Sequence, residues 1–118
     1  MWVTDRENSR IQIFDQDGKY LRELKYAGLP CAIEFHSDAI WMVNGFTGQI
    51  LKLDLDGKVL GVFGKSGTGP DEFGEAHYLT VSPKGEIYIA DVTKGVMKFV
   101  PKGSAVAAPP TGFGAVVR

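Results

Sequence analysis

The stretch Leu-Pro-Cys-Ala-Ile-Glu-Phe-His-Ser-Asp-Ala-Ile-Trp-Met-Val-Asn, residues 29–44, returns in altered form as Ala-His-Tyr-Leu-Thr-Val-Ser-Pro-Lys-Gly-Glu-Ile-Tyr-Ile-Ala-Asp at residues 76–91. The two stretches align without a gap at an offset of 47 residues, and their apolar positions coincide. A second ungapped offset, of 39 residues, aligns residues 2–24 with residues 41–63. An internal period of about 40 to 50 residues is typical of β-propeller blades. The sequence therefore predicts a repeat protein.

One complete repeat can be divided into four short strands. We expect them at residues 31–35, 39–43, 49–54 and 58–63, and no window shows a helical period. The turn Asp-x-Asp-Gly-Lys occurs at residues 15–19 and again at 54–58, with glycine where a hairpin needs a positive φ. The pattern predicts an all-β fold.

The whole chain then contains about two and a half four-stranded antiparallel blades. Residues 1–28 supply the second, third and fourth strands of one blade, residues 29–75 a full blade, and residues 76–102 the first three strands of another, which makes ten strands. Residues 103–118, with Ala-Pro-Pro and Gly-Phe-Gly, are predicted to be a flexible tail. A propeller normally closes with four to eight blades, so we expect a fragment of a longer ring.

Composition excludes several classes of protein. The net charge of -1 gives no reason to expect a nucleic-acid partner, and no apolar run reaches the roughly 20 residues of a membrane helix. Cys31 is the single cysteine, so no internal disulfide is expected. The first residues, Met-Trp-Val-Thr-Asp-Arg, have neither the basic nor the apolar region of a signal peptide.

Residues 5–15, Asp-Arg-Glu-Asn-Ser-Arg-Ile-Gln-Ile-Phe-Asp, resemble the NHL-repeat signature. Together with Leu-Arg-Glu-Leu-Lys at 21–25 and Ile-Trp-Met-Val-Asn-Gly at 40–45, they are similar to the later blades of the peptidyl-α-hydroxyglycine α-amidating lyase family. The resemblance covers residues 1–102. It implies a six-bladed propeller, secreted or periplasmic, whose zinc ion is held by three histidines from alternate blades. Such an enzyme cleaves a peptidyl-α-hydroxyglycine substrate to a peptide amide and glyoxylate.

His77 is the residue to which the resemblance assigns zinc. It precedes a predicted innermost strand, where equivalent residues of different blades converge on the axis. The ungapped alignment places Pro30 at the equivalent position and Cys31 opposite Tyr78, and proline cannot bind a metal. The family has an aspartate linked to a structural calcium after this histidine, whereas this chain has Tyr78. This departure counts against both the calcium and the lyase activity that the resemblance implies, even for an intact parent.

Arg6 is the second residue to which the resemblance gives a role. In the family the arginine of the Asp-Arg-Glu-Asn turn lies at the active-site face, where a guanidinium clamps the substrate carboxylate. The second blade has Gly45 at this position, so the repeat itself does not require a charge. The alternative is a surface arginine paired with Glu7.

Two classes of function follow. The first is a fragment of a zinc-dependent lyase, inactive by itself, with Arg6 as carboxylate clamp and His77 as zinc ligand. The second is a non-catalytic NHL-repeat propeller that binds a peptide or a protein. Further histidines at strand entries in the remainder of a longer parent chain would favour the enzyme.

Overall fold

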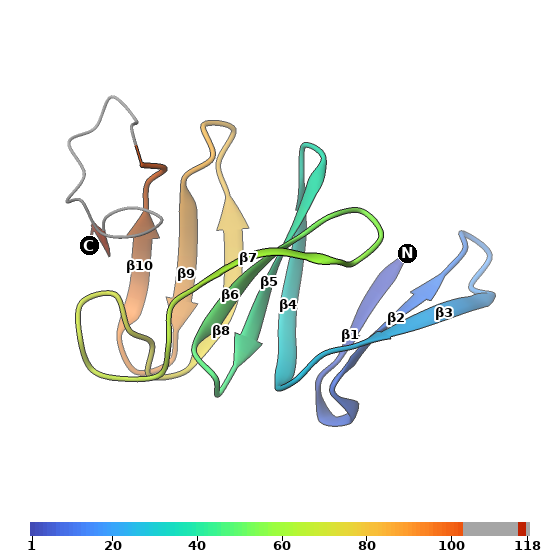
Figure 1. Ribbon diagram of the computed structural model, residues 1–118, viewed down its shortest axis with the longest axis horizontal. Helices are drawn as coiled ribbons and strands as arrows, with labels where there is room; N and C mark the ends of the chain where they lie inside the picture. Colours follow the sequence, from blue (N-terminus) through green and yellow to red (C-terminus); the bar gives the residue numbers. More distant parts are fainter. Residues whose placement is uncertain (103–115, 118) are drawn as a thin grey trace.

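The chain folds into three open antiparallel β-sheets that lie side by side (Figure 1). The structure, a computed structural model, describes residues 1–102 and 116–117. The first sheet contains β1 (Trp2–Asp5), β2 (Arg10–Phe14) and β3 (Tyr20–Lys25), with the 3₁₀ turn η1 (Arg6–Asn8) between β1 and β2. The middle sheet contains β4 (Leu29–His36), β5 (Ala39–Gly45), β6 (Gln49–Leu53) and β7 (Val59–Phe63). The third contains β8 (Ala76–Val81), β9 (Ile87–Asp91), β10 (Gly95–Phe99) and β11 (Val116–Val117). The predicted all-β class is confirmed.

The ten predicted strands correspond to β1–β10, and β11 is an addition. Each sheet is a meander in which sequential strands pair, and β11 pairs with β10 as the fourth strand of the third sheet. No strand was expected at residues 116–117, which fall within the segment predicted to be a flexible tail. The remainder of that segment, residues 103–115 and 118, lies outside the described residues.

Two equivalent hairpin turns owe their shape to an aspartate. Asp15 Oδ1 accepts hydrogen bonds from the backbone N–H groups of Asp17 and Lys19, both at 2.9 Å. Asp54 makes the same two bonds in the middle sheet, at 2.9 and 2.8 Å. An Asx turn followed by glycine in the left-handed region is a common way to close a hairpin. The carboxylates act on the backbone of their own turn.

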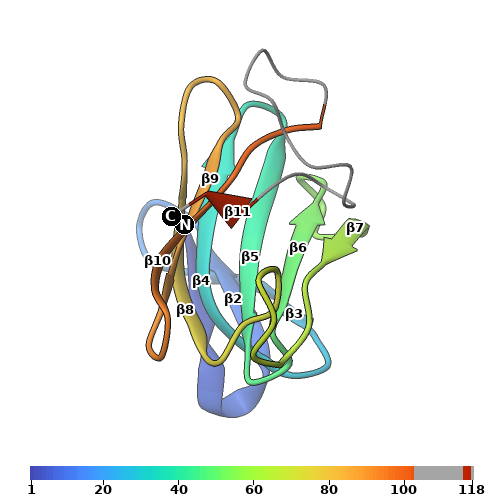
Figure 2. The ribbon, with the colours of Figure 1, turned by 90° about the vertical axis from the view of Figure 1, so that its left-hand side faces the viewer.

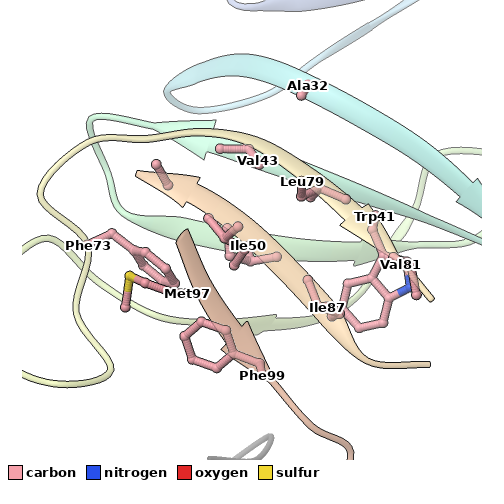
Figure 3. Packing of buried hydrophobic residues seen from close by; sticks show 12 residues of the cluster. Ala32, Trp41, Val43, Ile50, Phe73, Leu79, Val81, Ile87, Met97 and Phe99 are labelled. Atoms are coloured by element: carbon pink, nitrogen blue, oxygen red, sulfur yellow. The ribbon is translucent and has the colours of Figure 1, made fainter. Parts of the chain in front are cut away.

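Apolar side chains fill both spaces between the sheets. Between the first and middle sheets the buried residues are Ile11, Ile40, Met42, Leu51 and Leu53. Between the middle and third sheets they are Ala32, Trp41, Val43, Ile50, Phe73, Ala76, Leu79, Val81, Ile87, Ile89, Met97 and Phe99 (Figure 3). The middle sheet is therefore buried on both faces. Figure 2 looks along this row from the third sheet.

The long connection between the middle and third sheets is fastened by an aromatic residue. Phe73 is completely buried, and its ring centroid lies 5.5 Å from that of Phe99. The Phe73 N–H donates to the carbonyl of Lys65 at 2.9 Å, and the Lys94 ammonium donates to the carbonyls of Gly69 and Glu72. These contacts hold a glycine-rich segment against the sheets.

No helix among the described residues is long and apolar enough to cross a membrane.

Candidate functional site

The sheets have two ends that carry different residues. At the entry end, β4 and β8 begin and β1, β5 and β9 finish, so this end carries Arg6, Phe46 and His77 (bottom of Figure 1). At the opposite end, the turn end, short hairpin turns that contain Ser37 and Gly85 join β4 to β5 and β8 to β9. Both site residues predicted from the sequence lie at the entry end.

Arg6 is held by a neighbouring carboxylate. Its Nη2 lies 2.7 Å from Glu7 Oε1, and its Nε donates to the same oxygen at 2.8 Å. Glu7 raises the pKa of the Arg6 guanidinium above its ordinary value, and Cys31 adds to that rise. The Arg6 side chain is 39% exposed. A bound carboxylate must therefore share the guanidinium with Glu7 or displace it.

Phe46 is a site residue that the sequence analysis missed. Its ring centroid lies 5.9 Å from the Arg6 guanidinium carbon, within the range of a cation–π contact, and 56% of the residue is exposed. Its φ of 63° is unusual for an aromatic residue. The Ser66 hydroxyl, which donates to the Phe46 carbonyl at 2.7 Å, supports this conformation. The contact joins turns of the first and middle sheets.

His77 occupies a β-bulge, and its structural counterpart is Cys31. In β8 the register shifts between Ala76 and Tyr78, which leaves His77 without a cross-strand partner. In β4 the register shifts between Pro30 and Ala32, which leaves Cys31 in the same situation. The expected equivalence of His77 with Pro30 is therefore wrong by one residue.

The error comes from the hairpin turns. Ser37 and Asp38 form a two-residue loop between the paired His36 and Ala39. The corresponding loop in the third sheet, between Ser82 and Glu86, contains three residues. An ungapped alignment that matches β5 with β9 therefore mismatches β4 with β8 by one position.

The described residues do not fit a zinc or calcium centre. A catalytic zinc needs three protein ligands, and no group of three His, Cys, Asp or Glu side chains converges in the part of the chain that the structure describes. His77 is exposed and makes no hydrogen bond or ion pair with Arg6. The structure brings Arg6 to Phe46 and Cys31.

Buried polar side chains fix the backbone of the entry end. Asn44 and Asp91 are the last or next-to-last residues of β5 and β9. Asn44 Nδ2 donates to the Ala27 carbonyl at 2.6 Å, and Asp91 accepts from the Glu75 N–H at 3.0 Å. Burial by itself raises the pKa of Asp91, but hydrogen bonds from Thr93 and from backbone amides outweigh it and lower the pKa. Each side chain thus ties a strand end to the segment that enters its sheet.

Comparison with known proteins gives a fold and no function. No family model matches the chain, and no curated protein matches it. Among solved structures, a protein of unknown function from Bacteroides caccae is similar, with a TM-score of 0.72 and 15% sequence identity. The match covers 98% of this chain and 45% of that chain, so this chain spans less than half the length of that structure.

Proposed function

We propose that the three sheets are consecutive blades of a six-bladed, NHL-type β-propeller. This propeller acts as a non-catalytic scaffold and binds a peptide or protein at the entry end. The observation that carries the binding proposal is the exposed Phe46 ring beside the Arg6 guanidinium. An aromatic face next to a cation is suited to a peptide that ends in, or contains, a carboxylate beside an apolar side chain.

The open face of the third sheet supports the proposed ring. Val43 and Ile50 of the middle sheet are buried against the third sheet, and the corresponding cross-strand pair in the third sheet is Ala90 and Val96. Ala90 is exposed and Val96 is 63% exposed. The third sheet thus presents to solvent the same apolar positions that the middle sheet buries. A further blade would cover them in the same way.

The ring proposal is tested by the association state of the purified chain. We expect self-association in light scattering, because apolar blade faces are exposed. Val96→Lys should reduce it. Val92→Lys is the matched control, because Val92 is similarly exposed, at 65%, but lies in a turn outside the face. A monodisperse wild-type monomer with a cooperative melt would contradict the proposal.

The peptide-binding proposal is tested with two matched peptide libraries, one with free C-terminal carboxylates and one with the same sequences amidated. We expect the free carboxylates to bind about tenfold more tightly, which corresponds to ~1.4 kcal/mol. Arg6→Gln and Phe46→Ala should remove the difference, and Leu55→Ala, at a similarly exposed residue, should not. Glu7→Gln should strengthen binding, because it releases the guanidinium. Equal binding of both libraries would refute the proposal.

The lyase function is a second proposal, and the exposed position of His77 at the bulge of an innermost strand favours it. In that case the remaining zinc ligands come from other blades of a longer parent. We expect the 118-residue chain to bind zinc no better than a surface histidine does and to lack lyase activity. Zinc retained tightly and stoichiometrically by this chain, and lost on His77→Ala, would show that the site does not need other blades.

A further inference from the structure

A cavity of about 320 Å³ opens at the turn end, between the middle and third sheets. Its lining residues are His36, Ser37, Asp38, Ala39, Trp41, Lys52, Val81, Gly85 and Pro101. Figure 3 shows the Trp41 indole beside Val81. The volume lies in the range of small-molecule sites. The exposed Ser37 and Asp38 lie at its rim, so the cavity can be reached from solvent.

At the turn end of the third sheet, the carboxylate of Glu86 occupies the position that corresponds to this cavity. Lys98 pairs across the strands with Tyr88, and its ammonium lies 5.4 Å from the Tyr88 ring centroid. The Lys98 Nζ also lies 2.7 Å from Glu86 Oε1. The hydroxyl groups of Tyr88 and Ser82 donate to Glu86 Oε2 at 3.4 and 3.2 Å. One carboxylate therefore accepts from a cation and two hydroxyls.

The middle sheet keeps the cation and the aromatic ring but lacks the carboxylate. Lys52 pairs across the strands with Trp41, and its ammonium lies 5.6 Å from the Trp41 ring centroid. The position of Glu86, which pairs with Ser82 at the hairpin turn, is taken by Ala39, which pairs with His36. Lys52 makes no ion pair with any described residue. Asp38 is the only described carboxylate that lines the cavity, and it is not within ion-pair distance of Lys52.

We propose that this cavity binds a small organic monocarboxylate, whose carboxyl group takes the place that Glu86 holds in the third sheet. The Lys52 ammonium pairs with the carboxylate, and the His36 side chain stands where Ser82 donates in the third sheet. The apolar body of the ligand lies against Trp41, Val81 and Pro101. A cavity of this volume exceeds the space of a single carboxyl group, so the ligand carries an aromatic ring or a branched chain.

The test uses the full 118-residue chain and 4-fluorophenylacetate, followed by fluorine NMR. We expect saturable binding that weakens at least tenfold in Lys52→Met. Lys98→Met is the matched control, because it makes the same chemical change in the third sheet, and it should bind as the wild type does. Ala39→Glu should also abolish binding, because it supplies a protein carboxylate to Lys52. The neutral analogue 4-fluorobenzyl alcohol should bind at least tenfold more weakly than the acid.

Three results would overturn the proposal. They are no saturable binding by the wild type, equal binding by Lys52→Met and the wild type, or equal affinity for the acid and the alcohol. Since Lys52 is exposed, its replacement does not threaten folding, so the comparison stands even if Ala39→Glu fails to fold. The site lies at the opposite end of β5 from Phe46, so Phe46→Ala should leave the affinity for the carboxylate unchanged.

Discussion

The corner of the middle sheet around Ala39 and the corner of the third sheet around Glu86 have equivalent strand pairing, although the adjacent hairpin loop has two residues in one and three in the other. In both, a lysine lies over an aromatic ring on the neighbouring strand, at 5.6 Å in one and 5.4 Å in the other. The third sheet adds a carboxylate that neutralises the lysine, and the middle sheet has a cavity there instead. The first sheet pairs Trp2 with Ile13 at the equivalent position. The aromatic ring therefore recurs in all three sheets, the cation in the middle and third sheets, and the carboxylate in the third sheet.

The largest expected difference between the corners concerns their aromatic residues. Trp41 is 7% exposed and packs between two sheets, whereas Tyr88 lies on the open face of the third sheet. We expect Trp41→Ala to lower the free energy of unfolding by about 3–5 kcal/mol, because it leaves a cavity in the core. Tyr88→Ala should cost about 1 kcal/mol or less. Urea denaturation measures both, and equal costs would mean that the open face is covered.

The hairpin turns give a smaller contrast. Gly85 has a φ of 81°, and its Cβ position is free except for Pro101 Cγ at 3.5 Å. Gly85→Ala should therefore destabilise through the backbone alone, by about 1 kcal/mol. Ser37 has a φ of 55° without being glycine, so Ser37→Gly should raise stability by a few tenths of a kcal/mol, roughly. Thermal unfolding of the two variants should shift in opposite directions, and shifts of the same sign would contradict the turn conformations.

Transfer of the carboxylate from one corner to the other tests the comparison directly. Ala39→Glu places a carboxyl group beside Lys52, as Glu86 lies beside Lys98. A double-mutant cycle with Lys52→Met should give a favourable coupling of roughly 0.5–1 kcal/mol, the usual size for a partly exposed ion pair. Urea denaturation of the four proteins measures it. A coupling of zero would show that the two corners differ in more than the anion.

The smallest expected effect is a dependence of stability on pH that belongs to the third sheet. Lys98 lowers the pKa of Glu86 below its ordinary value of 4.5. Glu86 then stays ionised in the folded protein at a pH where the unfolded chain has already bound a proton. Its contribution is therefore present above pH 4.5 and is lost as the pH falls through the lowered pKa. Lys98→Met should reduce the loss of stability between about pH 6 and about pH 3, measured by urea midpoints. An unchanged loss would assign that dependence to other carboxyl groups.

The strands could be predicted from the sequence because their signals are local. Alternating apolar residues and the aspartate–glycine turns at Asp15 and Asp54 are read along the chain, and β1–β10 follow from them. The bulges could not be predicted. A bulge is defined by the pairing of two strands, so the match between His77 and Cys31 became visible only from the register.

The candidate sites were predictable only in part, for the same reason. Arg6 was placed correctly in a turn, but its neighbour Phe46 comes from another sheet and shares no sequence pattern with it. The difference between Ala39 and Glu86 was likewise hidden. The difference matters only in relation to the lysine of the same sheet. That lysine lies on the third strand of its sheet, Lys52 on β6 and Lys98 on β10, far from the hairpin turn in sequence.

The buried Phe73 shows that each packing unit of this chain is more than its strands. The connection between the middle and third sheets contributes Phe73 to the core between them, and the connection before the middle sheet packs Tyr26 against the neighbouring core. Four strands alone would lack this aromatic side chain, and a void would remain in the core. The packing unit therefore includes the connection ahead of β4 and β8 as well as the strands.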